Sequence, residues 1–345
     1  MTTETEIEPE TQALRDTNIL ITGADGFIGS HLVERALTEG ATVKAFCLYN
    51  SFGSAGWLDG SDRFKQAVRD GQADLVLGDV RDAEMVDRVV AGVDAVLHLA
   101  ALIAIPYSYV APRSYVDTNV TGTLNVLEAV RRHEIARMIN TSTSEVYGTP
   151  ESIPITETHR LRGQSPYSAT KIAADKMCES YALSFETPVV TVRPFNTFGP
   201  RQSARAVIPT VLSQLIAGSD EIHLGATTPR RDLTYVNDTC DGFVRAVHAD
   251  LAPGETIHLG TGTTYSIAEV VELCKKITGS AAQVVTDEDR LRPAGSEVEV
   301  LLSDPALALA RLGWRSTVGL EEGLELTRAW LEPRVDRESA ARYNR

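Results

Sequence analysis

The amino-acid sequence predicts an α/β protein built on a doubly wound parallel sheet, with a smaller C-terminal α/β lobe. Two observations lead to this prediction. Short apolar runs alternate with helix-periodic segments in the first half of the chain, and a glycine-rich turn stands between the first run and the first helix. Strands separated by helices imply βαβ units, whose strands are parallel. After about residue 195 prolines and glycines interrupt the pattern, which indicates a separate lobe.

The expected elements follow one another along the chain. Strands are predicted at 18–22, 42–46, 74–77, 95–99 and 136–140. Helices are predicted at 27–39, 118–132, 236–249, 266–278 and 320–331.

Length and charge limit the function classes. The 345 residues suggest two domains, and 33 Lys and Arg against 47 Asp and Glu give a formal net charge of −14. This charge argues against binding of nucleic acid or an anionic membrane surface, but a few local arginines could still hold a small phosphorylated ligand. Four scattered cysteines indicate neither a disulfide framework nor a metal site. We expect a cytoplasmic protein, because no targeting or membrane-spanning segment is apparent.

The glycine-rich turn follows the first predicted strand and opens the first helix. Residues 23–29 read Gly-Ala-Asp-Gly-Phe-Ile-Gly, a GxxGxxG spacing. Glycines permit a tight turn and a close approach of pyrophosphate to the backbone, and the N–H groups of a helix N-terminus bind phosphate. This context predicts a Rossmann-type dinucleotide site, with a plain glycine turn as the alternative. The residues expected to bind the dinucleotide here are Gly23, Asp25, Gly26, Phe27, Ile28 and Gly29.

The segment after the second strand lacks the acidic residue that usually holds the adenosine ribose. Asn50 and Ser51 stand there instead, and neutral side chains can meet a 2′-hydroxyl or a 2′-phosphate. We expect NAD, with NADP as the open alternative. Asp79, after the third strand, either accepts a hydrogen bond from the adenine amino group or caps the helix that begins near Arg81.

Tyr167 and Lys171 form a YxxxK pair, and an i, i+4 spacing places both side chains on one face of a helix. Pro166 suits the first position of that helix. An ammonium group near a phenol lowers the phenol's pKa, which suits a base that acts on a sugar hydroxyl. A YxxxK spacing is common by chance, so it indicates a catalytic pair only together with the glycine-rich turn upstream.

With these motifs the sequence resembles the extended short-chain dehydrogenase/reductase family. The shared features are GxxGxxG, Leu-His-Leu-Ala-Ala at 97–101, Asn-Val-Thr-Gly-Thr at 119–123 and YxxxK, over about residues 17–331. The resemblance implies a nicotinamide dinucleotide in the N-terminal domain and a nucleotide-diphosphate sugar in the C-terminal one. It also implies a homodimer through the helices near 118–132 and 167–185. Further implied cofactor contacts are Val80, Leu99, Ala100, Ala101, Tyr167 and Lys171.

The expected domains follow from this resemblance. They are a disordered acidic tail over 1–16, an NAD(P)-binding Rossmann domain over 17–195, a nucleotide-sugar-binding lobe over 196–332 with some chain crossing between the lobes, and a C-terminal tail over 333–345.

Residues 143–145, Thr-Ser-Glu, follow a predicted strand and should lie beside the nicotinamide. Family members with Thr-Asp-Glu or Thr-Ser-Glu here are sugar-nucleotide 4,6-dehydratases, UDP-glucuronate decarboxylases also carry Thr-Ser-Glu, and simple 4-epimerases usually lack the glutamate. Once C4 of the sugar is a ketone its C5 proton is acidic, and a carboxylate can remove it and help the C6 hydroxyl leave. The alternative for Glu145 is a structural role at the strand end.

The resemblance therefore implies an NAD-dependent nucleotide-sugar 4,6-dehydratase. Tyr167, with Lys171 and Thr143, would remove the O4 proton as hydride leaves C4, and Glu145, next to Ser144, would act at C5 and C6. Segments 50–59, 103–109, 199–209 and 290–314 resemble dehydratases of legionaminic-acid-type pathways, which act on nucleotide-linked N-acetylglucosamine. The alternatives are a UDP-glucuronate decarboxylase, a nucleotide-sugar 4-epimerase and a non-enzymatic dinucleotide-sensing protein.

Arginines of the second half are candidates for the substrate diphosphate, because a guanidinium pairs with phosphate oxygens bidentately. Arg231 precedes Asp-Leu-Thr-Tyr-Val, a motif whose arginine typically contacts diphosphate in the family, and Arg292 resembles a second clamp. Arg205 is a third candidate, and Arg230 could replace Arg231. Asn196 resembles a position that reaches the substrate pyrophosphate. The alternative for each arginine is a surface ion pair.

Overall fold

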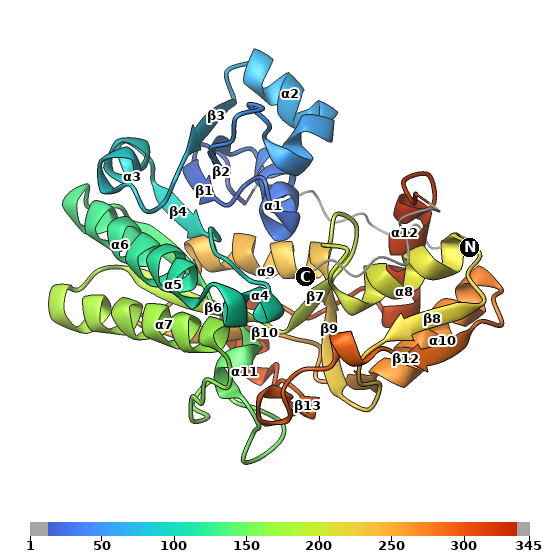
Figure 1. Cartoon of the computed structure of the whole chain (residues 1–345). Coiled ribbons are helices and arrows are strands. Elements are labelled where there is room, and N and C mark those ends of the chain that lie inside the picture. The colour runs from blue at the N-terminus through green and yellow to red at the C-terminus, as the bar shows by residue number, and fades with distance from the viewer. Residues whose placement is uncertain (1–12, 337–345) are drawn as a thin grey trace, which may run out of the picture.

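A seven-stranded parallel sheet forms the centre of the computed structural model, which describes residues 13–336 (Figure 1). Its strand order is β10-β6-β5-β4-β1-β2-β3, and every neighbouring pair is parallel. The strands are β1 (Asn18–Thr22), β2 (Thr42–Leu48), β3 (Ala73–Gly78), β4 (Ala95–His98), β5 (Arg137–Thr141), β6 (Val189–Pro194) and β10 (Thr256–Leu259). The chain starts in the middle of the sheet, runs to one edge and returns to the other, which confirms the predicted doubly wound fold.

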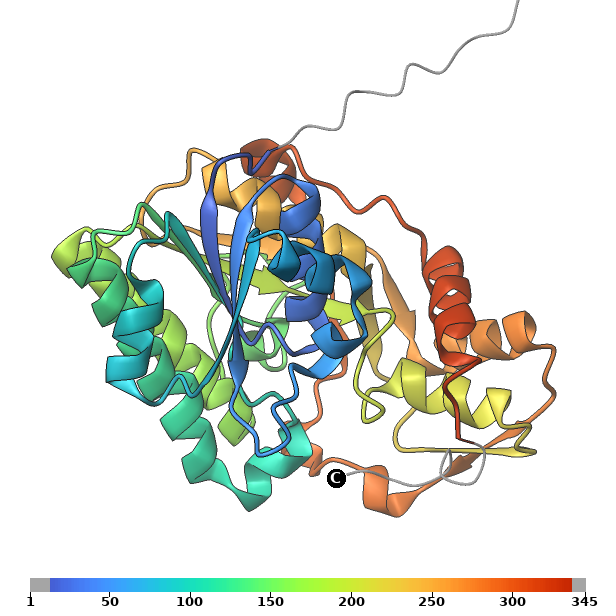
Figure 2. The ribbon, with the colours of Figure 1, turned by 90° about the horizontal axis from the view of Figure 1, so that it is seen from above.

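Helices cover both faces of this sheet (Figure 2). On β1, Ile19 and Ile21 are buried in one core and Leu20 in the other, because successive side chains of a strand point to opposite faces. The helices that belong to the core around Leu20 are α3 (Ala83–Val90), α6 (Gly122–Arg132) and α7 (Pro166–Phe185). Those of the core around Ile19 and Ile21 include α1 (Phe27–Thr38), α2 (Asp62–Arg69) and α9 (Val236–His248). Burial on both faces explains why the strands read as continuous apolar runs.

The connections that follow β2, β4 and β5 contain short helical turns. They are η1 (Gly56–Gly60), α4 (Ile105–Val110), α5 (Pro112–Tyr115), η2 (Val116–Thr121) and η3 (Ser144–Tyr147). The helix predicted at 118–132 therefore begins with a π-helical turn, η2, that precedes α6.

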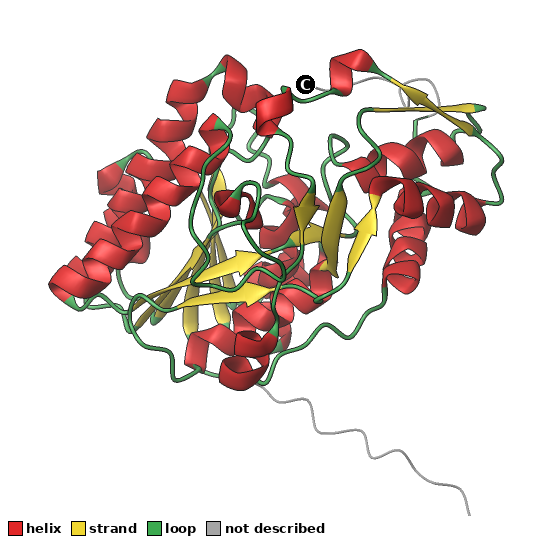
Figure 3. Cartoon of the chain, turned by 90° about the horizontal axis from the view of Figure 1, so that it is seen from below, coloured by secondary structure: helices red, strands yellow, loops and turns green. Residues whose placement is uncertain are grey.

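The second half of the chain builds smaller sheets beside the large one (Figure 3). β7 (Asn196–Phe198), β11 (Thr264–Ser266) and β13 (Val300–Leu301) each pair with β9 (Arg230–Tyr235), and β8 (Glu221–Leu224) pairs with β12 (Gln283–Thr286). The helices of this part are α8 (Val207–Ile216), α10 (Ile267–Thr278), α11 (Ala306–Leu312) and α12 (Leu320–Leu331), with short turns η4 (Glu288–Arg290) and η5 (Ala294–Ser296). The chain crosses back at α9 and β10, because α9 packs on α1 and β10 joins β6, and it returns again at α11, which packs on α9 and β10.

The expected tails need a correction at their inner boundaries. Residues 1–12 and 337–345 lie outside the described residues. Within the expected N-terminal tail, Leu14 is buried in the core and its N–H donates to Glu39 O at 3.2 Å. Within the expected C-terminal tail, Val335 packs against the same core and its N–H donates to Leu331 O at 3.0 Å. Residues 13–16 and 333–336 each place an apolar side chain against the core, so these residues belong to the folded part of the chain.

No helix within residues 13–336 has the length and apolar composition that a membrane span needs. In the same range, no group of three or more His, Cys, Asp or Glu side chains is arranged to hold a metal ion.

A buried carboxylate on α9 fixes the segment that leads to α12. Asp238 accepts hydrogen bonds from the Ser316 hydroxyl, from the N–H and hydroxyl of Thr317 and from the Val318 N–H, all at 2.7–2.9 Å. Asp241, one turn further along α9, forms ion pairs with Arg35 and Arg245 that are partly exposed.

We predict that Asp238→Ala lowers the free energy of unfolding by about 3 kcal/mol, since several buried donors lose their acceptor. Urea denaturation measures this change. The matched control Asp241→Ala removes partly exposed ion pairs and should cost less than about 1 kcal/mol. An equal loss in the two variants would contradict this account of the 316–318 segment.

Candidate active site

The predicted motifs gather at one edge of the large sheet. The glycine-rich turn follows β1, residues 99–101 follow β4 and the Thr-Ser-Glu turn follows β5. These three strands are neighbours, and the carboxyl ends of parallel strands meet at the same edge. Helix α7, with Tyr167 and Lys171 in its first two turns, packs against the Thr-Ser-Glu turn.

The glycine-rich turn leaves no room for side chains. A Cβ on Gly29 would lie 2.1 Å from Gly23 O, and a Cβ on Gly23, which has φ +68°, would lie 2.8 Å from Ala100 N. Helix α1 has Gly26 as its N-cap residue and no side-chain cap, so the N–H groups of its first turn can bind phosphate. These residues fit the pyrophosphate of a dinucleotide.

A directional chain of hydrogen bonds holds the segment after β4. The Thr123 hydroxyl donates to Asn119 O at 2.7 Å, so it accepts from His98 Nε2 at 3.0 Å. His98 Nδ1 then accepts from the Thr22 hydroxyl at 2.8 Å, whose oxygen accepts the N–H groups of 99–100 at 3.1 Å. Burial lowers the pKa of His98 to about 3, so the ring stays neutral and keeps these roles. His98 is thus a buried structural residue beside the expected cofactor contacts.

The other expected cofactor residues lie around this edge. Ala101 and Phe27 are half-buried, and Ile28 packs against the core. Burial raises the pKa of Asp25. Val80 packs against Gly122, where an added Cβ would lie 2.9 Å from a Val80 methyl group.

Asn50 and Asp79 already use much of their hydrogen-bonding capacity within the chain. The Asn50 side chain accepts from the N–H of Ser54 at 3.1 Å and donates to Ser54 O at 2.8 Å, so it shapes its own loop. Asp79 forms an ion pair with Arg81, which lowers the pKa of Asp79. The alternative role of Asp79 as a helix cap is wrong, because the Asp82 side chain caps α3 by accepting from the Met85 N–H at 3.1 Å.

Tyr167 and Lys171 are buried on the same side of α7. Helix α7 begins at Pro166, after Ser165 and Ser168 cap each other in a capping box. The ring of Tyr115 packs edge-on against Tyr167 with centroids 6.3 Å apart. Lys171 Nζ donates to Thr141 O at 2.6 Å, which anchors the lysine to the end of β5.

The electrostatics of Tyr167 differ from the expectation. Burial raises the pKa of the phenol, a side-chain hydrogen bond with Thr143 opposes this, and the Glu145 and Asp175 carboxylates raise it further. The Lys171 ammonium, which was expected to lower the pKa of the Tyr167 phenol, is not among the dominant influences on that pKa. Burial also lowers the pKa of Lys171, against the attraction of Asp175. The negative charges around the phenol therefore outweigh the lysine in this structure.

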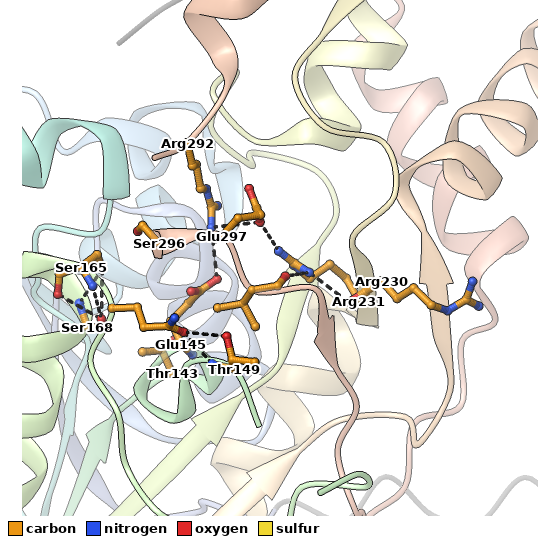
Figure 4. A network of polar contacts seen from close by, with 12 residues as sticks. Thr143, Glu145, Thr149, Ser165, Ser168, Arg230, Arg231, Arg292, Ser296 and Glu297 are labelled. Atoms are coloured by element: carbon orange, nitrogen blue, oxygen red, sulfur yellow. Dashed lines mark hydrogen bonds and ion pairs between the residues drawn. The ribbon is translucent and has the colours of Figure 1, made fainter. Parts of the chain in front are cut away.

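Glu145 lies in a short helical turn that starts with Thr143. Thr143 has an extended backbone, and its hydroxyl oxygen accepts from the Glu145 N–H at 3.3 Å. Ser144 is buried inside the turn. The Glu145 carboxylate faces Arg292, whose Nη1 lies 3.8 Å from Glu145 Oε1 (Figure 4). The turn thus presents a carboxylate close to Tyr167 and opposite an arginine.

Two of the predicted arginines meet at Glu297. Arg231 Nη2 donates to Glu297 Oε1 at 3.0 Å, and Arg292 Nη1 lies 3.8 Å from the same oxygen (Figure 4). Arg230 points away and pairs with Glu269 at 3.1 Å, so Arg231 is the one of the two that joins Arg292. Glu297 was not predicted as a site residue from the sequence, although it stands five residues after Arg292.

The remaining predicted substrate residues lie at the start of β7 and before α8. Asn196 is the first residue of β7, and its Oδ1 is buried with no hydrogen-bond partner among residues 13–336. An orphaned buried acceptor of this kind suits a ligand donor. Arg205 is exposed, and its charge acts on Tyr115. The structure therefore brings Arg231 and Arg292 together and leaves Arg205 on the surface.

Sequence reasoning missed a buried polar network beneath Tyr167 and Lys171. Asp175 lies one turn after Lys171 and pairs with Arg193 of β6 at 2.9 Å, and both side chains are buried. Arg193 also donates to the Tyr147 hydroxyl at 2.7 Å. An available signal was the i, i+4 continuation of YxxxK to an acidic residue at 175.

The glycine contacts give a direct test of the expected cofactor site. We predict that Gly29→Ala weakens NAD⁺ binding at least about tenfold, because the new methyl group must displace the Gly23 backbone. Titration calorimetry with NAD⁺ measures the change. Gly60→Ala is the control, since nothing lies within 4 Å of a Cβ there and its φ is not positive. Unchanged affinity in Gly29→Ala would place the dinucleotide elsewhere.

Comparison with known proteins agrees with this geometry. The family model described as GDP-mannose 4,6 dehydratase matches residues 20–327. A dTDP-glucose 4,6-dehydratase of Actinoplanes sp. is 32% identical over 316 residues, which cover 90% of this chain and 97% of that protein. The chain is also similar to two solved structures. DesIV, a dTDP-glucose 4,6-dehydratase of Streptomyces venezuelae with NAD bound, has a TM-score of 0.82 and 28% identity over 92% of this chain and 97% of its own.

The second structure is the UDP-glucose 4-epimerase of Thermotoga maritima with UDP-glucose. It has a TM-score of 0.82 and 28% identity, and the match covers 92% of this chain and 100% of that one. The relatives thus include dehydratases and epimerases, and the family model spans most of the chain. The chain belongs to the GDP-mannose 4,6-dehydratase family and is an NAD-dependent sugar-nucleotide dehydratase or epimerase.

Proposed function

We propose that the protein is a nucleotide-sugar 4,6-dehydratase, which converts an NDP-hexose or NDP-N-acetylhexosamine to its 4-keto-6-deoxy form. The position of Glu145 carries the proposal. Its carboxylate acts on the Tyr167 phenol and lies 3.8 Å from Arg292 Nη1. A carboxylate beside the catalytic tyrosine can serve proton removal at C5 and departure of the C6 hydroxyl, and epimerisation at C4 needs neither.

Oxidation at C4 is the step that family dehydratases and epimerases share. Tyr167 takes the proton of the C4 hydroxyl, and the hydrogen bond with Thr143 favours the phenolate. Lys171 lies on the same helix as Tyr167 and donates a hydrogen bond to Thr141 O at the end of β5. NAD⁺, when bound, supplies the acceptor for the hydride that leaves C4.

The proton count of dehydration gives Glu145 two tasks. Glu145 removes the C5 proton of the 4-keto sugar and passes it to the C6 hydroxyl, which leaves as water. Hydride then returns to C6 and one proton is added at C5. The proton that Tyr167 took from O4 balances the proton that C5 gains. The sugar therefore loses one water, and no external oxidant or reductant is consumed.

Each of the two parts of the chain would bind one ligand. Residues 17–195 would hold the cofactor at the glycine-rich turn, and the lobe over 196–332 would hold the nucleotide sugar. Arg231 and Arg292 would bind the diphosphate in place of Glu297, and Asn196 Oδ1 is an acceptor for a substrate donor. The resemblance to legionaminic-acid-type dehydratases makes nucleotide-linked N-acetylglucosamine the first substrate to test.

We also infer a cytoplasmic homodimer that forms through α6 and α7, which pack side by side (Figure 1). Leu183 and Phe185, at the end of α7, expose 79% and 50% of their surface. Arg131 of α6 lies over the Phe185 ring at 4.8 Å, so the two helices meet at this exposed apolar end of α7, which a second copy could cover.

The substrate class is tested with UDP-GlcNAc, GDP-GlcNAc, dTDP-glucose and UDP-glucuronate, each read by mass spectrometry. We expect loss of one water from a hexose or N-acetylhexosamine nucleotide. Loss of CO₂ from UDP-glucuronate, or a new isomer of unchanged mass, would contradict the dehydratase assignment. Tyr167→Phe should lower kcat at least about 10²-fold, since the base for O4 is removed.

The pH dependence of C4 oxidation tests the environment of Tyr167. A phenol with a raised pKa is protonated at neutral pH, so the rate of NADH formation in a single turnover should rise with pH. Glu145→Gln removes a negative charge that raises this pKa, so the rise moves to lower pH. Thr143→Val removes the opposing hydrogen bond, so the rise moves to higher pH. Each shift should be on the order of one pH unit. Shifts in the same direction would refute this electrostatic account.

A further inference from the structure

The buried ion pair of Asp175 and Arg193 joins the two segments that carry the reacting groups. Asp175 lies on α7, one turn after Lys171 and two after Tyr167. Its Oδ2 accepts from Arg193 Nη2 at 2.9 Å and Nε at 3.2 Å. The side chains expose only 4% and 6% of their surface, so water screens this pair little.

The same pair holds both ends of the turn that presents Glu145. At one end the Ser142 hydroxyl donates to Asp175 Oδ2 at 2.6 Å, directly before Thr143. At the other end Arg193 Nη1 donates to the Tyr147 hydroxyl at 2.7 Å, two residues after Glu145. The turn is therefore bonded to the ion pair on both sides of the Thr-Ser-Glu residues, directly to Asp175 of α7 at one end and to Arg193 of β6 at the other.

At Tyr147 and His258 the direction of each hydrogen bond of the network is determined. Arg193 has only donors, so the Tyr147 oxygen accepts from it and the Tyr147 proton points to His258 Nε2, 2.5 Å away. Burial lowers the pKa of His258 to about 3, which leaves Nε2 free to accept. His258 in turn is held by its backbone N–H, which donates to Glu157 at 3.0 Å. Arg193 thus cannot turn away without breaking its hydrogen bonds to Asp175 and Tyr147.

We propose that the Asp175–Arg193 pair is a positioning unit that sets the distance between Tyr167 and Glu145 needed for elimination. The inference extends the proposed function, because Glu145 acts at C5 and C6 only after Tyr167 has acted at O4 on the same sugar. Neither side chain of the pair acts on the substrate. A misplacement of about 1 Å between the two groups can cost about 10²-fold in rate.

A purely structural role would give a different mutational pattern. Removing one partner of a buried pair leaves an unpaired charge and destabilises the fold, whereas replacing both with apolar side chains can be neutral for stability. The experiment therefore uses Asp175→Asn, Arg193→Lys and the double variant Asp175→Leu/Arg193→Met. Each is loaded with NAD⁺ and assayed with the nucleotide sugar that the wild type consumes. The control is Glu179→Gln, one turn further along α7, where Glu179 forms an ion pair with exposed Lys176.

We expect the double variant to unfold at nearly the wild-type temperature while kcat stays about 10²-fold lower and KM changes less than about threefold. Asp175→Asn should lose kcat to a similar extent, Arg193→Lys less, and Glu179→Gln should keep wild-type activity. Recovery of kcat together with stability in the double variant would overturn the proposal. Ser142→Ala and Tyr147→Phe, which each cut one link and keep the ion pair, should lower kcat without raising KM; unchanged kcat in both would also overturn it.

A second measurement does not depend on dehydration. Crystal structures of the NAD⁺-bound wild type and double variant give the separation between the Tyr167 hydroxyl and the Glu145 carboxylate. The proposal requires this separation to change by about 1 Å. If the wild type proves to be an epimerase, the dehydratase assignment fails while this measurement still decides the role of the pair. An unchanged separation refutes the positioning role whatever the reaction is.

Discussion

The active site depends on the parallel register that places the ends of β1, β4 and β5 side by side. Each strand end carries one part of the site: the glycine-rich turn, residues 99–101 and the Thr-Ser-Glu turn. The close contact between Gly23 and Ala100 leaves no space for a side chain, so the first two parts share one surface. The third part is tied to α7 by Asp175 and Arg193. Hydrogen bonds, together with packing, therefore set how the reacting groups face one another.

Opposing influences act on the pKa of Tyr167. Burial and two carboxylates hold the phenol in its protonated form, while Thr143 favours the phenolate. In the proposed reaction a deprotonated Tyr167 removes the O4 proton, so Thr143 acts in the direction that the reaction needs. Arg231 and Arg292 are both engaged with Glu297. If Arg231 and Arg292 bind the diphosphate as proposed, they exchange Glu297 for its phosphate oxygens.

Much of the fold could be predicted from local patterns. The strand at 18–22 and the helix at 320–331 coincide with β1 and α12, because apolar runs and helical periodicity are local signals. Tyr167, Lys171 and Glu145 were found through motifs that are contiguous in sequence. The partners of Arg193 were not predictable in this way, since they come from α7 and η3 and meet only in the tertiary structure. The same holds for Leu14, a single apolar residue whose burial depends on the core.

The central claim is that Glu145 moves a proton at C5 during loss of the C6 hydroxyl. The most direct test is turnover of the accepted nucleotide sugar in D₂O, with the product analysed by NMR and mass spectrometry. We expect a 4-keto-6-deoxy sugar that has lost one water and carries one deuterium at C5, with the C4 hydrogen transferred to C6. Glu145→Gln should accumulate NADH without this product. A product with an undeuterated C5 and an intact C6 hydroxyl would contradict the claim and assign the enzyme to the epimerases.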